Sequence, residues 1–300
     1  MAVDRLLVTG AAGMVGNYVK DVFSDCELHL TDMSGFIRNG TVLDVCDSVA
    51  VMQTLQRVKP DVVLHLAGAT DVDRCEQEPD WAYAVNATGT QNVAEACEAT
   101  GALLVYVSTG NVFSGDKDEA YTEYDIPGPC NVYGESKLAG EQIVASLLNR
   151  YCIVRAGWMM GGGEKDKKFV GKIAQMILGG ETQLKAVDDK FGSPTYARDL
   201  LLGISKLVDT GYYGLYHMVN PGVASRYEIA QAVLDILKRP EVEIEPVSSA
   251  HFPLPAPRIR LEALRNHKLG LLGLDWMRPW RVALEGYLRD DLLPALSARL

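Results

Sequence analysis

The sequence lacks the patterns that mark several large classes of protein. No apolar run approaches the roughly 18 residues needed to cross a bilayer, and residues 1–16 have neither the basic start nor the cleavage site of a secretory signal. Basic residues are in the minority, with 29 Lys and Arg against 39 Asp and Glu. Because a surface that wraps nucleic acid needs a basic stripe, the formal charge of −10 argues against one. We therefore expect neither a membrane protein nor a nucleic-acid-binding protein.

Cysteine and histidine are scarce and scattered. The six cysteines form no C-x-x-C pair, and the five histidines show no metal-ligand spacing. A chain of 300 residues can bury a core large enough to fold without disulfides. We expect free thiols, a cytoplasmic location and no metal site in the chain.

Apolar, β-branched segments alternate with segments of helical periodicity through the first half of the chain. The expected strands are 5–9, 27–31, 61–66, 103–108 and 152–155, and the expected helices are 14–23, 49–58, 81–98 and 133–148. Such alternation implies right-handed βαβ crossovers and a parallel sheet that helices cover on both faces. The predicted fold class is α/β, with a Rossmann-type doubly wound parallel sheet.

The pattern loosens after Arg155. Further helices are expected over 169–178, 199–208, 225–237 and 280–296, with a turn over 192–199 and a proline-rich loop over 246–257. We expect an NAD(P)-binding Rossmann domain and a smaller C-terminal substrate-binding lobe. The first would comprise residues 1–156 with about 188–217, and the second about 157–187 and 218–300.

Three glycines follow the first expected strand at the spacing G-x-x-G-x-x-G. They are Gly10, Gly13 and Gly16, with Met14 and Val15 between the last two. Glycines allow a tight turn and a close approach to a pyrophosphate, and the following helix N-terminus offers free N–H groups. The loop predicts a dinucleotide site, and a purely structural glycine turn is the alternative.

Asp32 ends the second expected strand, where a carboxylate can accept hydrogen bonds from the adenosine ribose hydroxyls. Its charge would repel a 2′-phosphate, so the sequence slightly favours NADH over NADPH. Arg38 is close enough in sequence to weaken this preference, and a turn residue is the alternative role for Asp32.

Tyr133 and Lys137 form a Y-x-x-x-K pair on one face of an expected helix. A nearby ammonium group would lower the pKa of the tyrosine and bring it closer to the working range of a general acid. Ser108 and Thr109 follow the fourth expected strand and offer hydroxyls to a reacting oxygen. A Tyr–Lys pair on a solvated face is the alternative.

Together these motifs resemble the extended short-chain dehydrogenase/reductase superfamily and, within it, the dTDP-4-dehydrorhamnose reductase family. The resemblance spans nearly the whole chain. It is carried by the glycine loop and by S-T-G-N-V-F-S-G at 108–115, N-V-Y-G-E-S-K-L-A-G-E at 131–141, R-A-G-W at 155–158 and F-G-S-P-T at 191–195.

The resemblance implies roles for individual residues. Asn86 would organise structure, and Thr109, Tyr133 and Lys137 would be catalytic. Thr109 would contact the substrate and position its carbonyl oxygen. Tyr133 would donate the proton, Lys137 would hold the nicotinamide ribose, and both would contact the cofactor. Further residues would line the cofactor, at the adenine or beside the third strand: Asp44, Val45, Leu66, Ala67 and Gly68.

The implied substrate is a nucleotide-diphosphate 4-keto-6-deoxyhexose, reduced by NAD(P)H. Trp158 would lie against the sugar, and a core aromatic is the alternative. Gly110 and Asn111 replace the family's Asp-Tyr directly after Thr109, and Arg258 begins an R-I-R segment where the family has R-P. Because these departures lie where the substrate would be bound, the sequence leaves the identity of the hexose open.

Basic residues in the second half are candidates for holding the diphosphate, with a solvated face as the alternative. They are Lys165, Lys167, Lys168, Lys172, Arg258 and Arg260. Two other functions stay open: an NAD-dependent nucleotide-sugar epimerase or dehydratase, and a non-catalytic NADP-binding regulatory subunit similar to the methionine adenosyltransferase β subunit. The oligomeric state is also open, although folds of this kind commonly form homodimers.

Overall fold

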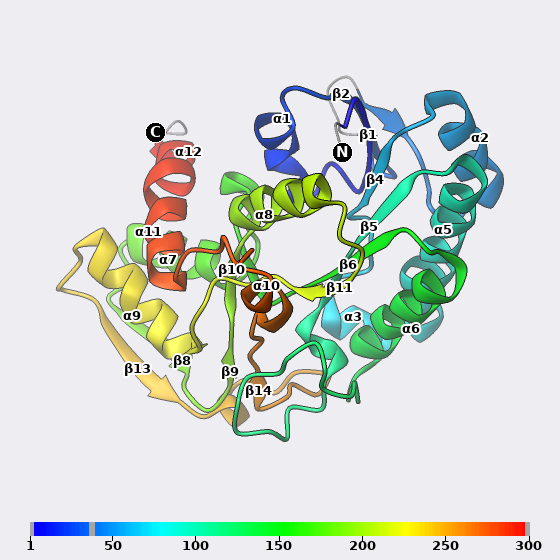
Figure 1. Cartoon of the computed structure of the whole chain (residues 1–300). Coiled ribbons are helices and arrows are strands. Elements are labelled where there is room, and N and C mark those ends of the chain that lie inside the picture. The colour runs from blue at the N-terminus through cyan, green and yellow to red at the C-terminus, as the bar shows by residue number, and fades with distance from the viewer. Residues whose placement is uncertain (1–2, 36–39, 298–300) are drawn as a thin grey trace.

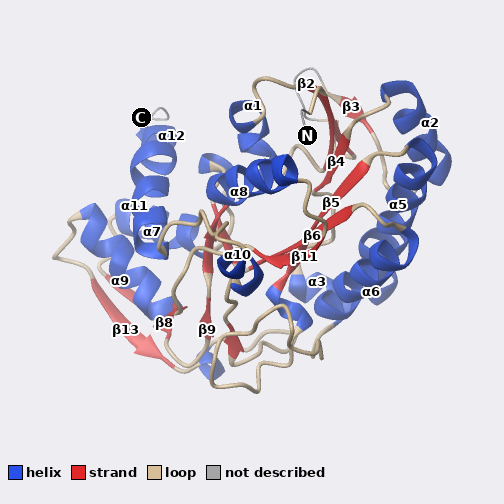
Figure 2. Ribbon diagram, in the orientation of Figure 1, coloured by secondary structure: helices blue, strands red, loops and turns tan. Residues whose placement is uncertain are grey.

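The computed structural model describes residues 3–35 and 40–297, and its centre is a seven-stranded parallel sheet (Figures 1 and 2). In spatial order the strands are β11 (Gly214–His217), β6 (Tyr151–Ala156), β5 (Leu103–Thr109), β4 (Val62–His65), β1 (Arg5–Thr9), β2 (Glu27–Asp32) and β3 (Thr41–Val42). All neighbouring strands in this sheet run parallel. The predicted Rossmann-type α/β class is confirmed.

Side chains alternate between the two faces of the sheet, as the pleat requires. In β1, Leu6 and Val8 join one core and Leu7 joins the other. The face of Leu7 is covered by α2 (Ser48–Val58), α5 (Gly89–Thr100) and α6 (Val132–Leu147), and the opposite face by α1 (Val19–Val22) and α8 (Ala197–Thr210). Burial on both faces explains why the strands appear in the sequence as unbroken apolar runs.

The second half of the chain adds smaller sheets and helices, seen mostly on the left of Figure 1. Its strands are β7 (Trp158–Met160), β8 (Gln183–Val187), β9 (Phe191–Gly192), β10 (Pro194–Tyr196), β12 (Ala224–Ser225), β13 (Glu243–Val247) and β14 (Leu261–Glu262). Its other helices are α7 (Phe169–Leu178), α9 (Arg226–Leu237), α10 (His267–Leu271), α11 (Trp280–Tyr287) and α12 (Leu293–Ser297). These strands pair as β7 with β10, β8 with β13, and β12-β9-β14.

Several segments differ in form from the sequence-based expectation. The expected helix over 14–23 is a 3-10 turn at Val15–Tyr18 followed by α1. The expected helix over 81–98 is α4 (Pro79–Tyr83), a π turn and α5, and the sequence did not predict α3 (Val72–Gln77). The expected turn over 192–199 contains β10, and the expected loop over 246–257 begins inside β13. β10 has only three residues, and β13 mixes two glutamates and a proline with its apolar residues, so neither shows the apolar run by which the strands of the main sheet were predicted.

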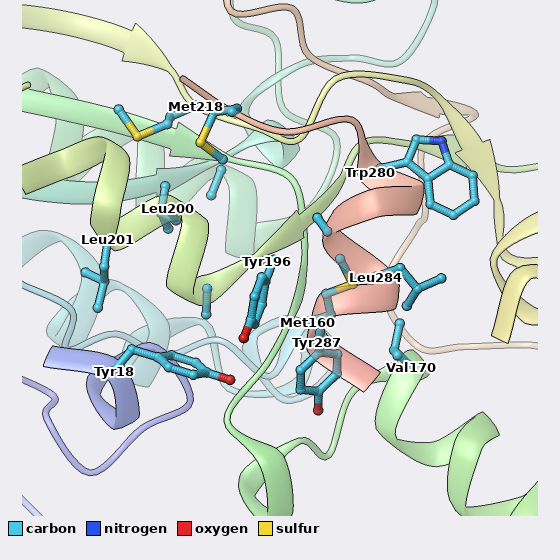
Figure 3. Close-up of a cluster of buried hydrophobic side chains, with 14 of the residues drawn as sticks. Tyr18, Met160, Val170, Tyr196, Leu200, Leu201, Met218, Trp280, Leu284 and Tyr287 are labelled. Atoms are coloured by element: carbon cyan, nitrogen blue, oxygen red, sulfur yellow. The ribbon is translucent and has the colours of Figure 1, made fainter. Parts of the chain in front are cut away.

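One hydrophobic core joins the first helical segment to the C-terminal segment (Figure 3). Tyr18, Tyr196 and Tyr287 lie in this core, and each phenol donates a hydrogen bond to a carboxylate. Tyr18 donates to Asp291 Oδ2 at 2.6 Å, Tyr196 donates to the same oxygen, and Tyr287 donates to Asp166 at 2.8 Å. The helix that follows the glycine loop is therefore tied to the end of the described chain.

Within the described residues, no helix has both the length and the apolar character needed to span a membrane. The six cysteines are free thiols. Arg38 lies outside the described residues, so its expected effect on cofactor preference stays a prediction.

Candidate active site

A cavity of about 710 Å³ opens at the carboxyl ends of β1 and β4. The order of the sheet reverses at these two strands, which is where doubly wound folds bind their ligands. Residues of the second half, among them Phe169, Arg226 and Glu262, complete the cavity wall. Both halves of the chain thus contribute to one site.

The glycine loop forms one end of this cavity. Gly10, Gly13, Met14 and Val15 line it. Gly10 has a φ of +70°, and a Cβ there would lie 2.5 Å from the backbone nitrogen of Ala67, so only glycine fits. The bare backbone leaves room for a ligand to approach the chain closely.

Gly16 has a different place from the other glycines of the motif. It does not line the cavity, and a Cβ on it would lie 2.2 Å from the carbonyl oxygen of Ala11. Its part is to let the helix pack against the loop, and the expectation that it contacts the cofactor directly is not supported by its position.

Asp32 lies in the cavity wall beside this loop. Its Oδ2 accepts a hydrogen bond from the Ala12 nitrogen at 3.1 Å, and its Oδ1 accepts one from the Ser34 nitrogen at 2.8 Å. The carboxylate therefore links the loop after β1 to the loop after β2. The remaining residues expected at the cofactor also line the cavity: Asp44, Val45, Leu66, Ala67 and Gly68.

Asn86 is buried behind the cavity. Its Oδ1 accepts from the Ala69 nitrogen at 2.8 Å, and its Nδ2 donates to the Ala69 oxygen and to Ser136 Oγ, both at 3.0 Å. These bonds fix the segment after β4 against α6. The arrangement fits the organising role that the sequence implied.

The three residues expected to be catalytic meet in the middle of the cavity. Thr109 ends β5, and its hydroxyl lies near the phenol of Tyr133, in the first turn of α6, closely enough to favour the ionised form of that phenol. Lys137, one turn further along α6, donates from Nζ to the Val107 oxygen at 2.9 Å, and Nζ lies 4.0 Å from the ring centroid of Tyr106.

Ser108 serves a different purpose from Thr109. Ser108 also lines the cavity, but its hydroxyl donates to the buried Glu141 Oε1 at 2.5 Å. Within the described residues, the one hydrogen bond of Thr109 Oγ is the one that it accepts from the backbone nitrogen of Asn111, at 3.2 Å. Thr109 is therefore the hydroxyl that can turn to a ligand.

Burial controls the acid–base character of this group. It raises the pKa of the Tyr133 phenol; the nearby Thr109 hydroxyl opposes this rise, and the charge of Glu262 adds to it. Burial also lowers the pKa of Lys137 to about 7, against the attraction of Glu141. The expectation that Lys137 lowers the pKa of Tyr133 is wrong for this arrangement, because desolvation dominates and the Lys137 ammonium is directed at the Val107 carbonyl.

Trp158 borders the far end of the cavity, where it is held by protein groups. Its Nε1 donates to Glu262 Oε2 at 2.8 Å, and the Arg226 guanidinium carbon lies 3.7 Å from the indole centroid. A Cβ on Gly192 would lie 2.4 Å from the indole Cε2, so that backbone packs against the ring. A sugar could stack on the ring face beneath Arg226 only if that arginine moved.

The other expected substrate residues fall into two groups. Asn111 and Arg258 line the cavity, and Arg258 pairs with Asp73 at 2.9 Å. Gly110 does not line it: this residue is buried under Glu262, and a Cβ on Gly110 would lie 3.0 Å from Glu262 Cγ.

The basic candidates also divide. Lys168 lines the cavity, and its Nζ donates to the Thr70 oxygen at 3.3 Å. Arg260 lies outside and pairs with the exposed Asp118 at 2.7 Å. Three further lysines also lie outside the cavity lining: Lys165, Lys167 and Lys172. For these residues the solvated surface is the better interpretation.

Sequence reasoning missed Arg226 and Glu262. Arg226 is the first residue of α9, directly after Ser225 and its capping box with Glu228. The capping pattern could predict a helix start there, but not that the arginine lines a cavity. Glu262 lies in β14, which carries no recognisable motif.

Comparisons with known proteins agree with this geometry. Residues 4–292 match the family model described as RmlD substrate binding domain. The chain is 38% identical over 286 residues to a dTDP-4-dehydrorhamnose reductase of Mycobacterium tuberculosis, covering 94% of this chain and 91% of that protein.

Two solved structures of enzymes with the same name are similar to the whole chain. The structure of dTDP-4-dehydrorhamnose reductase from Bacillus anthracis, in complex with NADP, has a TM-score of 0.89 and 35% identity and covers 96% of this chain and 100% of that chain. The enzyme from Yersinia enterocolitica has a TM-score of 0.86 and 40% identity and covers 95% of this chain and 98% of that chain. The chain belongs to the RmlD substrate binding domain family.

Proposed function

We propose that this protein is an NAD(P)H-dependent reductase of a dTDP-linked 4-keto-6-deoxyhexose, of the dTDP-4-dehydrorhamnose reductase type. The observation that carries the proposal is that Thr109, Tyr133 and Lys137 meet in one cavity, which a glycine loop borders at one end. The names of the relatives and the NADP in the Bacillus anthracis structure support the reaction class and the nicotinamide cofactor.

The cofactor would lie across the carboxyl ends of β1, β2 and β4. The residues fit such a group, because Gly10, Gly13 and Gly68 present backbone without side chains to the cavity, beside the carboxylate of Asp32. Asp32 would accept from the adenosine ribose. When bound, the reduced nicotinamide supplies the hydride that the carbonyl carbon receives.

The protein's own residues would supply the proton and hold the substrate. Tyr133 is protonated at neutral pH because burial raises its pKa, so it can donate its proton to the keto oxygen as that oxygen becomes a hydroxyl. Thr109 would donate a hydrogen bond to the same oxygen and fix its position. Lys137, one turn along the helix, would hold ribose hydroxyls.

The diphosphate of the substrate would meet a basic wall. Arg226 lines the cavity, and in the described part of the chain its side chain makes no direct hydrogen bond or ion pair, although the charge of Glu262 acts on it through space. Burial lowers its pKa to about 10, so it stays charged at neutral pH. Lys168, Lys190 and Arg258 line the same region. In the proposal, Arg226 therefore replaces Lys165, Lys167 and Lys172, which lie outside the cavity lining, as the leading diphosphate contact.

We also propose the division into an NAD(P)-binding domain of 1–156 with about 188–217 and a substrate-binding lobe of about 157–187 and 218–300. The place of β11 at the edge of the main sheet and of α8 against α1 supports it. The free thiols support a cytoplasmic location. A homodimer stays a prediction.

The proposal is tested by mixing the purified protein with dTDP-4-dehydrorhamnose and either NADH or NADPH. We expect one equivalent of reduced cofactor to be oxidised for each sugar reduced. Tightly bound NAD⁺ that recycles without net oxidation would instead indicate an epimerase or dehydratase. Cofactor binding without turnover, together with copurification of another enzyme, would indicate a regulatory subunit. Either result contradicts the reductase.

A further inference from the structure

Glu262 places a carboxylate in the wall of the cavity, close to the proposed reacting groups. The residue is 9% exposed and lines the cavity. Its Oε1 accepts from Asn111 Nδ2 and its Oε2 accepts from Trp158 Nε1, both at 2.8 Å. An ionised carboxylate can accept about four hydrogen bonds. Because these are its two side-chain partners in the described part of the chain, about half of its accepting capacity is unused.

The carboxylate is held rigidly. Asn111 Oδ1 accepts a hydrogen bond from Asn131 Nδ2 at 3.2 Å, and Asn131 is the N-cap of α6, where its own Oδ1 accepts from Gly134 at 2.8 Å. On the other side, the Trp158 indole is packed between Arg226 and the backbone of Gly192. The orientation of Glu262 is therefore fixed by the protein itself, before any ligand binds.

The carboxylate is also close to the catalytic pair. The backbone nitrogen of Asn111 donates to Thr109 Oγ at 3.2 Å, and the side chain of Asn111 contacts Glu262. Glu262, Thr109 and Tyr133 line the same cavity, and the charge of Glu262 acts on the Tyr133 phenol. A ketone oxygen held by Thr109 and Tyr133 thus leaves the neighbouring part of the sugar facing Glu262.

The buried carboxylate of Glu262 has no direct ion-pair partner within the described residues. Burying a carboxylate is costly unless it is paired or hydrogen-bonded. Arg226 and Arg258 act on Glu262 through space, and Arg258 is paired with Asp73. The chain keeps an acceptor with spare capacity at a place where the proposed substrate carries hydroxyl donors.

We propose that Glu262 is a specificity-determining residue that accepts a hydrogen bond from the hydroxyl on the ring carbon beside the keto carbon of the sugar. The inference rests on the proposed function and extends it by naming the sugar hydroxyl that the protein recognises. It predicts that the enzyme prefers sugars with a free 3-hydroxyl over 3-deoxy sugars.

The test measures binding by calorimetry, with dTDP-rhamnose as the ligand and dTDP alone as the ligand control. Glu262→Gln keeps the size of the side chain and removes its charge. We expect Kd for dTDP-rhamnose to rise about 10- to 100-fold, since a hydrogen bond to a charged group is lost, while Kd for dTDP alone stays within about 2-fold. The matched control is Glu245→Gln, an exposed glutamate on β13 that pairs with Lys185; it should change neither Kd.

A second arm compares two ligands on the wild-type protein, so it does not depend on the folding of a variant: replacing dTDP-rhamnose by its 3-deoxy analogue should raise Kd by a similar factor. Where Glu262→Gln folds, it should add little further loss with that analogue. An unchanged Kd for the analogue, or equal losses for dTDP and dTDP-rhamnose in Glu262→Gln, would overturn the role of Glu262. If wild-type protein neither binds dTDP-rhamnose nor reduces the keto sugar, the proposed function itself fails.

Discussion

Arg155 holds Glu141 in a two-point ion pair beneath the active site, with Nε donating to Oε1 at 2.9 Å and Nη2 to Oε2 at 2.6 Å. Both side chains are at most 4% exposed. Glu141 lies on α6 one turn after Lys137 and favours the charged form of that lysine. The pair therefore connects β6 to the helix that carries Tyr133 and Lys137.

Replacing Glu141 by leucine should destabilise the fold strongly. The change leaves the Arg155 guanidinium buried without its carboxylate, which costs about 3–5 kcal/mol. Urea unfolding measures the effect. The matched control is Glu78→Leu, which breaks the exposed Arg74–Glu78 pair and should leave the midpoint almost unchanged. Equal midpoints for Glu141→Leu and the wild type would contradict the importance of the buried pair.

Lys137→Met should change how stability depends on pH. The pKa of Lys137 falls from its usual 10.5 to about 7 in the fold, so between these values the unfolded chain binds more protons than the folded one. Wild-type stability therefore gains a contribution as pH rises from 7 towards 10.5, and the variant lacks it. We therefore expect the free energy of unfolding of the wild type, relative to that of Lys137→Met, to increase by about 2–3 kcal/mol between pH 7 and pH 9.5.

The control for this measurement is Lys20→Met, which changes an exposed lysine on α1. Its stability relative to the wild type should be the same at both pH values. If Lys137→Met behaves in the same way, Lys137 is charged in the fold throughout this range.

Tyr133→Phe should lower kcat with dTDP-4-dehydrorhamnose by about 10²- to 10⁴-fold, because the proton donor is lost. Cofactor affinity, measured by fluorescence of the reduced nicotinamide, should stay close to that of the wild type. Tyr83→Phe removes a phenol that donates to Glu135 at 3.3 Å on the surface, and it should be fully active. Full turnover by Tyr133→Phe would rule out its role as the acid.

Asp32→Ser should shift cofactor preference towards NADPH. The variant removes the charge that would repel a 2′-phosphate and weakens the acceptor for ribose hydroxyls. We expect the ratio of kcat/KM for NADPH over NADH to rise by about 10-fold or more, equivalent to about 1.4 kcal/mol. Asp25→Ser, at an exposed position before β2, is the control. An unchanged ratio would mean that Asp32 does not set cofactor preference and that its role is limited to its structural hydrogen bonds.

Gly10→Ala should do more damage than Gly101→Ala. Both glycines have a positive φ, +70° and +74°. An alanine in this left-handed conformation should lower the stability of either variant by about 1–2 kcal/mol. Only the Cβ on Gly10 meets other atoms, 2.5 Å from the Ala67 nitrogen. Gly10→Ala should therefore also lose cofactor binding, measured by nicotinamide fluorescence, whereas Gly101→Ala should bind normally.

The cofactor end of the site could be predicted because its chemistry is local in sequence. Gly10 and Gly13 belong to one loop, and Tyr133 and Lys137 lie four positions apart on one helix. Strand and helix periodicity was enough to place both motifs at the carboxyl ends of parallel strands. Gly16 was the exception, because its packing against Ala11 is a property of the folded loop.

The sugar end could not be predicted in the same way, because it is built from contacts between distant positions. Asn111 and Glu262 are separated by 151 positions, and Trp158 and Glu262 by 104. The effect of Lys137 on Tyr133 was also mispredicted, because sequence spacing shows which groups are near but not how much water surrounds them.

The bond between Tyr18 and Asp291 has a consequence for synthesis of the protein. The two residues are 273 positions apart, so the first helix after the glycine loop gains this partner only when almost the whole chain has been made. At about 5–20 residues per second on the ribosome, the delay is roughly 14–55 s. During that time the nascent Rossmann half exposes the surface that the last helix covers, and ribosome stalling or C-terminal truncation would leave a cofactor-binding half prone to aggregation.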